Sequence, residues 1–73
     1  MIPTINMAET GARIKLYMDL QGCSVKDIQN ELGLACPQGV YKWIHGDSLP
    51  SLDNLVALAA VFHVSINDIL VIE

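Results

Sequence analysis

Apolar residues recur at intervals of three and four along most of the chain, the spacing that gathers side chains on one face of an α-helix. The first such segment follows Asn6, which forms a capping pair with Glu9, and it stops before Gly22. The pattern therefore predicts a helix over residues 7–21. Its mostly apolar face is formed by Ile14, Tyr17, Met18 and Gln21.

Two shorter helices are predicted in the middle of the chain. Ser24 and Asp27 form the start signal of the first, which carries an apolar face of Val25, Ile28 and Leu32 and ends at Gly33. The second lies in the stretch CPQGVYKWIHG, residues 36–46. Pro37 suits the first helical position, and Gly46 suits the left-handed residue after the helix end.

The last third of the chain predicts two more helices. After the loop GDSLP, Ser51 caps a helix over 52–62 that ends at His63 in the left-handed position usually taken by Gly or Asn. Its expected packed stripe is Leu52, Leu55, Val56, Ala59 and Phe62. Ser65 and Asp68 then cap a final helix that carries Ile66, Ile69 and Leu70. We find no alternating strand pattern, repeat or linker, so we expect an all-α domain of five helices over residues 1–73, with a short N-terminal arm over 1–6.

The third predicted helix has two chemically different faces. At about 100° per residue, one arc of about 100° holds Gln38, Tyr41, Lys42 and His45, and the opposite side holds Val40, Trp43 and Ile44. Most polar helix faces only contact water, and such faces favour Glu and Lys. This face contains no acidic residue, which favours a role in binding. Gln recognises adenine edges, and Lys and Tyr reach phosphates or guanine. Two short helices joined by a tight turn, the second with such a face, indicate a helix-turn-helix over about 24–45.

Size and composition limit the alternatives. A chain of 73 residues has room for one domain, and a hydrophobic content of 52% indicates extra apolar surface for a partner. No apolar run is long enough to span a membrane, and the start MIPTINMAET does not resemble a signal peptide. We therefore expect a cytoplasmic protein with no membrane partner.

The net charge of −4 is unevenly distributed. Residues 1–23 are neutral, residues 24–48 carry a net charge of −1, and the last 25 residues carry −3 without any Lys or Arg. The acidic last third would not face a polyanion, so a DNA-binding surface is expected in the first two thirds.

The two cysteines do not indicate a disulfide scaffold or a metal site. Cys23 and Cys36 are expected to stay reduced in the cytosol, as buried or capping thiols. Together with His45 and His63 they lack the paired spacing that fixes two zinc ligands on one turn.

Catalysis is not expected either. The candidates His45, Asp47 and Ser48 lie on one tight loop, where they cannot form a triad. The chain has no phosphate-cradling glycine motif. We therefore expect no enzyme activity, no cofactor or metal, and no small-molecule ligand.

Two blocks of sequence resemble a known family. The blocks are TGARIKLYMDLQGCSVKDIQNELGL and CPQGVYKWIHGDSLPSLDNLVALAAVFHVSINDIL, and the resemblance covers about residues 10–70. They resemble the Cro/phage-repressor (Xre-type) helix-turn-helix domain of small bacterial transcriptional regulators. The resemblance implies a five-helix, lambda-repressor-like DNA-binding domain, binding of a double-stranded DNA operator through the third helix, and homodimerisation.

The resemblance also implies which residues form the site. Gln38, Tyr41 and Lys42 occupy the family's base- and phosphate-contacting positions. With their neighbours, the expected DNA-contacting set is Ser24, Lys26, Pro37, Gln38, Tyr41, Lys42 and His45. The expected core anchors are Trp43, Val40, Ile28 and Leu55.

Two functions follow from these observations. The first is a sequence-specific transcriptional regulator, a repressor, that reads the major groove and dimerises through its last helix and the apolar tail ILVIE. The alternative is a degenerate helix-turn-helix that acts as a protein-interaction or antitoxin-like module with weak or no DNA binding. Its supports are the acidic balance, the apolar surplus and the departures from the family pattern, such as Val25 and Ile44 at commonly polar positions.

Overall fold

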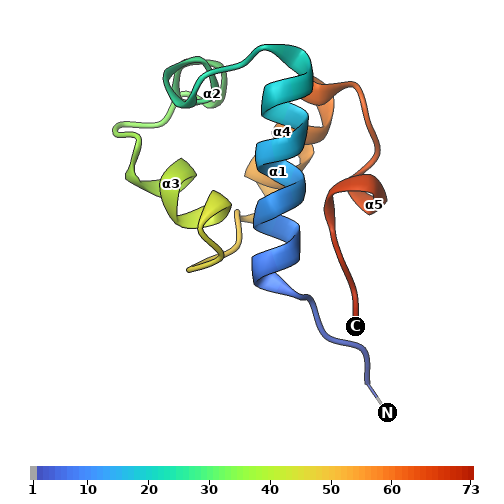
Figure 1. Cartoon of the computed structure of the whole chain (residues 1–73). Coiled ribbons are helices and arrows are strands. Elements are labelled where there is room, and N and C mark those ends of the chain that lie inside the picture. Colours follow the sequence, from blue (N-terminus) through green and yellow to red (C-terminus); the bar gives the residue numbers. More distant parts are fainter. Residues whose placement is uncertain (1) are drawn as a thin grey trace.

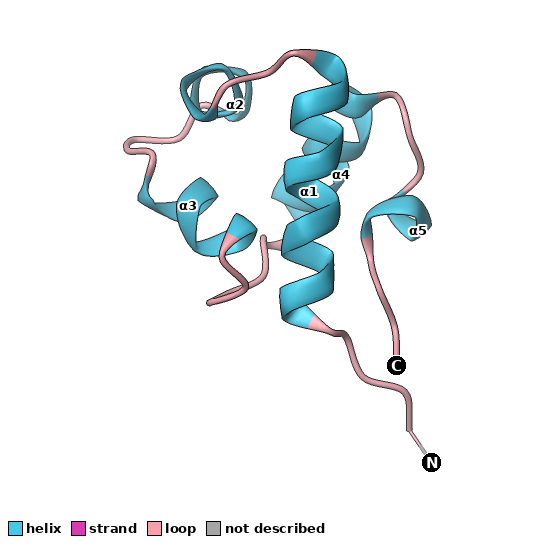
Figure 2. Cartoon of the chain, in the orientation of Figure 1, coloured by secondary structure: helices cyan, strands magenta, loops and turns pink. Residues whose placement is uncertain are grey.

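The computed structural model describes residues 2–73 and contains five helices in the order that the sequence predicts. They are α1 (Met7–Gln21), α2 (Val25–Leu32), α3 (Gln38–Ile44), α4 (Leu52–Phe62) and α5 (Ile66–Ile69). Figure 1 shows α1 running through the middle of the molecule, with α2 and α3 to one side, α5 to the other and α4 behind. Short loops join the helices (Figure 2). The all-α, five-helix prediction is confirmed.

The helix boundaries follow local signals. Asn6 caps α1 by accepting the N–H of Glu9 at 2.9 Å, and Ser51 caps α4 by accepting the N–H of Asn54 at 3.2 Å. Ser24 and Asp27 form a reciprocal capping box at the start of α2. At the helix ends, left-handed backbone occurs at the predicted positions Gly22, Gly33, Gly46 and His63. These caps satisfy backbone groups that a helix leaves unpaired at its ends.

Every helix contributes to one hydrophobic core. The buried apolar residues are Ile14, Met18, Ile28, Val40, Trp43, Leu55, Leu58, Ala59, Phe62 and Ile69. Tyr17 of α1 stacks on Phe62 of α4 with their ring centroids 5.7 Å apart. A domain of this size has little apolar surface to spare, so each of these side chains carries a large share of its stability.

The predicted packed stripe of α4 is partly wrong. Leu52 and Val56 are 80% and 56% exposed, whereas Leu58, which the stripe omitted, is fully buried. The buried face is instead Leu55, Leu58, Ala59 and Phe62, with the i, i+3, i+4, i+7 spacing of one helical face. Because α4 is apolar on more than one side, hydrophobic spacing alone does not indicate which of two neighbouring stripes faces the core.

The start of α3 also differs from the prediction. Pro37 is the residue before the helix, not its first residue, and its carbonyl accepts the N–H of Tyr41 at 3.2 Å. Cys36 is exposed and does not cap the helix, contrary to the expected buried or capping thiol. Cys23 is half-buried against the core.

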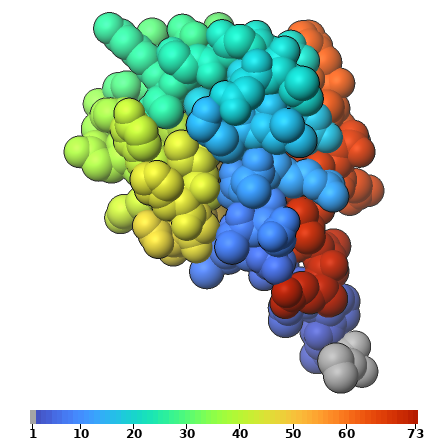
Figure 3. All heavy atoms as spheres, viewed as in Figure 1, coloured from blue at the N-terminus to red at the C-terminus, as the bar shows by residue number. Residues whose placement is uncertain are grey.

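The backbones of α1 and α3 approach each other closely at Gly11. A Cβ atom at this position would overlap the carbonyl oxygen of Trp43 and lie 3.0 Å from that of Ile44. Near the start of α1, Gly46 in turn lies against Ala8, whose Cα would be 2.8 Å from a Cβ at position 46. Figure 3 shows the segment after α3 lying directly against the first half of α1. Glycine in the middle of a helix is costly, and here it permits a contact that any side chain would prevent.

The N-terminal arm pairs with the C-terminal tail. The N–H of Asn6 donates to the carbonyl of Val71 at 2.8 Å, and Thr4 and Glu73 exchange backbone hydrogen bonds, with an isolated antiparallel bridge between Ile5 and Ile72. Both ends therefore project together from the molecule (Figure 3). Met1, the first residue of the predicted arm, lies outside the described residues.

More of the apolar tail ILVIE, residues 69–73, is buried within the domain than the sequence suggested. Ile69 is fully buried, Leu70 packs against the core, and Val71 is half-buried. Ile72 remains 59% exposed. The backbone N–H of Val71 also donates to the hydroxyl of the buried Thr10, at 3.0 Å. The surplus of apolar surface expected at ILVIE is therefore reduced to Ile72 and its neighbours in the arm.

The burial of Trp43 predicts a large loss of stability on truncation. Trp43→Ala should lower the free energy of unfolding by about 3–5 kcal/mol, because it removes a large buried ring and leaves a cavity. Denaturant unfolding followed by circular dichroism would measure this. Leu52→Ala is the control and should change stability by less than about 0.5 kcal/mol. A Trp43→Ala variant within about 1 kcal/mol of wild type would contradict the position of α3.

The contact at Gly11 predicts opposite outcomes for two glycine substitutions. Gly11→Ala should lower the free energy of unfolding by about 1–3 kcal/mol, because the new methyl group forces α1 and α3 apart. Gly39→Ala should be neutral or stabilising by up to about 1 kcal/mol, since its Cβ meets only the Trp43 ring at 3.8 Å and alanine favours the helix. Thermal and denaturant unfolding of both variants test this, and a stabilised Gly11→Ala protein would contradict the close approach.

Candidate nucleic-acid interface

The backbone at the C-terminal end of α3 fixes the direction of the helix. The N–H of His45 donates to the carbonyl of Tyr41 at 3.0 Å, and that of Asp47 donates to the carbonyl of Lys42 at 2.9 Å. Gly46 adopts a φ of 77°, which lets the chain turn away sharply after the last helical residue. The helix is therefore a short, defined segment of two turns.

The two predicted faces of α3 separate in the structure. Val40 and Trp43 are buried and Ile44 packs against the core. The opposite face is exposed and consists of Gln38, Tyr41, Lys42 and His45. The rings of Tyr41 and His45 stack with centroids 6.2 Å apart and an angle of 30° between their planes. This stack makes a continuous amphipathic surface along the outer side of the helix, with Lys42 beside it.

The positive charge of α2 and α3 comes from one lysine on each helix. Within residues 2–73 the single ion pair joins Lys15 and Asp19 of α1. Lys42 on α3 and Lys26 on α2 are both exposed and form no ion pair with the described residues. Their ammonium groups can bind phosphate oxygens, whereas Gln38 can form paired hydrogen bonds with a base edge.

Ser24 has a structural role in addition to the predicted contact. Its hydroxyl accepts the N–H of Asp27 at 3.1 Å, and the Asp27 carboxylate accepts the backbone N–H of Ser24 at 2.9 Å. The hydrogen bond from the Ser24 backbone N–H, and then that with the Ser24 side chain, lower the pKa of Asp27 below its usual value. The carboxylate therefore stays ionised at neutral pH and keeps α2 capped.

The turn between α2 and α3 is stabilised by a side chain. Gln29 Nε2 donates to the carbonyl of Leu34 at 3.4 Å, and the N–H of Leu34 donates to the carbonyl of Gln29 at 2.9 Å. Pro37, half-buried, closes the turn. The remaining predicted core anchors, Ile28 of α2 and Leu55 of α4, are both buried in the core.

Sequence reasoning missed two residues that position this interface. Gly11 allows α1 to support α3, and Thr10 ties α1 to the tail through the N–H of Val71. The signal that could have indicated Gly11 is its place in the middle of a helical pattern, because such a glycine often marks a close backbone approach. Thr10 gave no comparable signal.

Other kinds of site are not formed by the described part of the chain. Among residues 2–73, no three His, Cys, Asp or Glu side chains are grouped to hold a metal ion. In the same range no helix combines the length and apolarity required to cross a membrane.

Comparison with known proteins agrees with this geometry. The helix-turn-helix family model matches residues 14–69, which is more than half of the chain. No curated protein matches the chain. Among solved structures, the restriction-modification controller protein C.AhdI from Aeromonas hydrophila superposes with a TM-score of 0.77 at 21% sequence identity, over 86% of this chain and 94% of that one.

The structural likeness shows that the two proteins share a fold, and the family match covers the segment that contains α2, the turn and α3. The chain belongs to the helix-turn-helix family of the Cro/C1 type.

Proposed function

We propose that the protein is a sequence-specific DNA-binding transcription regulator that inserts α3 into the major groove of an operator. The observation that carries this proposal is the exposed face of α3, which contains Gln, Tyr, Lys and His and no acidic residue, in a domain of the helix-turn-helix family. The chain acts as a repressor in this proposal, because a protein that occupies an operator excludes other proteins from it.

The exposed side chains divide between attachment and recognition. Gln38 lies in the first turn of α3, where a recognition helix meets base edges. Lys42, one turn later, and Lys26, at the start of α2, supply charge to phosphates on either side. Tyr41 contributes its hydroxyl to a phosphate or its ring to a thymine methyl group.

We further propose that the protein binds DNA as a homodimer. One helix-turn-helix reads few base pairs, and two-fold dimers place two recognition helices about one helical turn, some 34 Å, apart. The paired arm and tail offer a surface for this contact beside α5, because Ile2, Ile5 and Ile72 are all exposed there. Burying these side chains between two copies would remove them from water.

The DNA-binding proposal predicts different effects for two substitutions on α3. Lys42→Ala should weaken binding to all DNA sequences by a similar factor and reduce the salt slope by about one unit, because a lysine on phosphate carries no sequence information. Gln38→Ala should lose about 1–3 kcal/mol on the preferred site and little on random DNA. Fluorescence anisotropy with both DNAs, after selection of the preferred site from a random pool, measures these effects.

The matched control is Lys15→Ala, which removes the same charge from α1, where Lys15 is already paired with Asp19. It should leave binding to both DNAs nearly unchanged. If Lys42→Ala and Gln38→Ala both bind every DNA as wild type does, the α3 face is only solvated, and the protein-interaction module is the better interpretation.

The dimer proposal predicts a specific disruption at the tail. Ile72→Glu should shift the protein toward monomer in sedimentation equilibrium, because the carboxylate would be buried against an apolar surface. Leu20→Glu makes a similar change on α1 at another exposed apolar position and should leave the dimer intact. A wild-type protein that stays monomeric at high concentration and occupies single half-sites would rule out the homodimer.

A further inference from the structure

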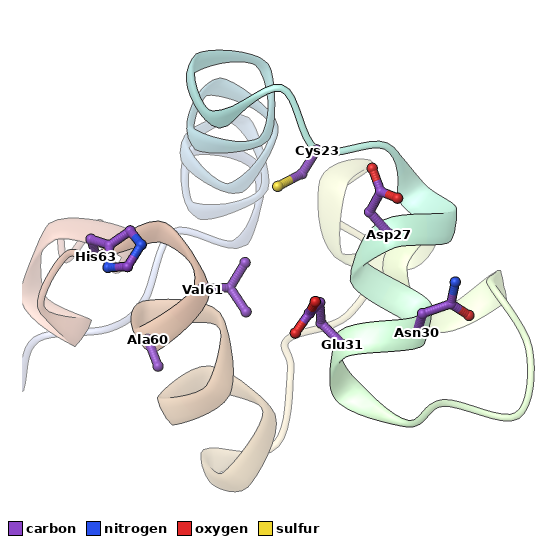
Figure 4. Close-up of a pocket in the computed structure, with 7 residues that line it drawn as sticks. All are labelled: Cys23, Asp27, Asn30, Glu31, Ala60, Val61 and His63. Carbon is purple, nitrogen blue, oxygen red and sulfur yellow. The ribbon is translucent and has the colours of Figure 1, made fainter.

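A groove between α2 and the C-terminal half of α4 is used neither by the core nor by the α3 face. It has a volume of about 610 Å³. Its α2 wall consists of Asp27, Asn30 and Glu31, and its α4 wall includes Ala60 and Val61 (Figure 4). None of the lining residues comes from α3 or belongs to the expected DNA-contacting set.

The two walls of the groove differ in chemistry. In Figure 4, Glu31 and Val61 extend toward one another from α2 and α4, so that a carboxylate faces an apolar side chain across the opening. The apolar wall continues beyond the groove, because Val56 and Leu52 precede Ala60 by one and two helical turns on the same side of α4. All three residues are exposed. They form an apolar stripe, Leu52, Val56 and Ala60, that the core does not use.

The charged residues that line the groove are all acidic, and the basic Lys26 of α2 is not among the lining residues. Asp27 and Glu31 line it, and Asp53 lies beside the stripe at the start of α4. No Lys or Arg occurs after Lys42, so neither α4 nor α5 contributes a cation, and His63 is the remaining titratable group of the α4 wall. This surface would repel DNA. It would also repel an identical surface, because a two-fold dimer places each patch against its own copy.

We propose that this groove binds an amphipathic helix with basic flanks, supplied by another protein. The apolar residues of such a helix, at i, i+4 and i+7, would cover Val56, Ala60 and Val61. Its Lys or Arg side chains would reach Glu31 and Asp27 on the opposite wall. Exposed apolar side chains beside an acidic wall fit this chemistry.

Selection from a displayed peptide library tests the proposal directly. Each peptide would span about four helical turns, with apolar residues fixed at helical spacing and all other positions varied. Selection on the immobilised full chain should enrich peptides with Lys or Arg flanking the apolar face. Enrichment of peptides with acidic or uncharged flanks, or no enrichment, would overturn the proposal.

Variants of the protein then locate the binding site of the selected peptides. Glu31→Gln should weaken peptide binding about threefold to tenfold, and Ala60→Asp should weaken it at least about tenfold, by placing a charge in the apolar wall. Glu9→Gln removes the same charge from α1 and should have no effect. Amide chemical shifts and DNA binding of each variant confirm that the fold and the α3 face are unchanged.

Two further outcomes of the same measurements would overturn the proposal. Selected peptides that bind Glu31→Gln and Ala60→Asp as tightly as wild type do not use the groove. Concentration-dependent amide shifts at Ala60 and Val61 in the peptide-free protein would mean that a second copy covers this surface. Neither outcome depends on whether the protein binds DNA.

Discussion

The position of α3 depends on one backbone contact, in which Gly11 of α1 lies against the carbonyl groups of Trp43 and Ile44. Helices that meet through side chains keep their axes about 8–10 Å apart, whereas glycine allows a closer approach. The contact of Gly46 with Ala8 supports the same end of α3 from the loop that follows it. With Trp43 in the core on the other side, α3 is held from two directions. The outward direction of Gln38 and Lys42 is therefore set largely by α1.

The first half of α1 is itself fixed by the C-terminal segment. Asn6 caps the helix and also donates through Nδ2 to the carboxylate of Glu73 at 2.7 Å. Arg13 reaches the carbonyl of Asp68 at 2.8 Å, and the Thr10 hydroxyl accepts the N–H of Val71. The segment of α1 that supports α3 is thus the segment that binds the tail. In the proposed dimer, one rigid helix would connect the subunit contact to the recognition helix and so fix the spacing of the two α3 helices.

The features that sequence analysis predicted are those decided by neighbouring residues. Caps such as Ser24 and stops such as Gly22 act within one helical turn, so their effect is visible in a short window of sequence. The exposed face of α3 was also predictable, because helical angles alone separate Gln38 from Trp43.

The exposure of Leu52 was not predictable from the sequence, since α4 has two apolar stripes and only its packing against the other helices selects one of them. The pairing of the arm with the tail likewise joins residues at opposite ends of the chain, for which no local pattern exists. Base contacts depend on the DNA as well as on the protein, so no pattern in the chain specifies them.

The small number of basic residues constrains how this fold can bind DNA. The chain has four Lys and Arg residues in total. Lys15 is paired with Asp19, and Arg13 donates to a carbonyl of the C-terminal segment, which leaves Lys26 and Lys42 for phosphates. Because each phosphate contact contributes about 0.9 to the salt slope, one protomer could contribute a slope of only about −2. Non-specific attachment would therefore be weak, and most of the affinity for an operator would have to come from base contacts, from uncharged donors such as Tyr41 and from the pairing of two half-sites. A regulator of this kind gains selectivity from its low charge, because random DNA competes poorly when phosphates contribute so little.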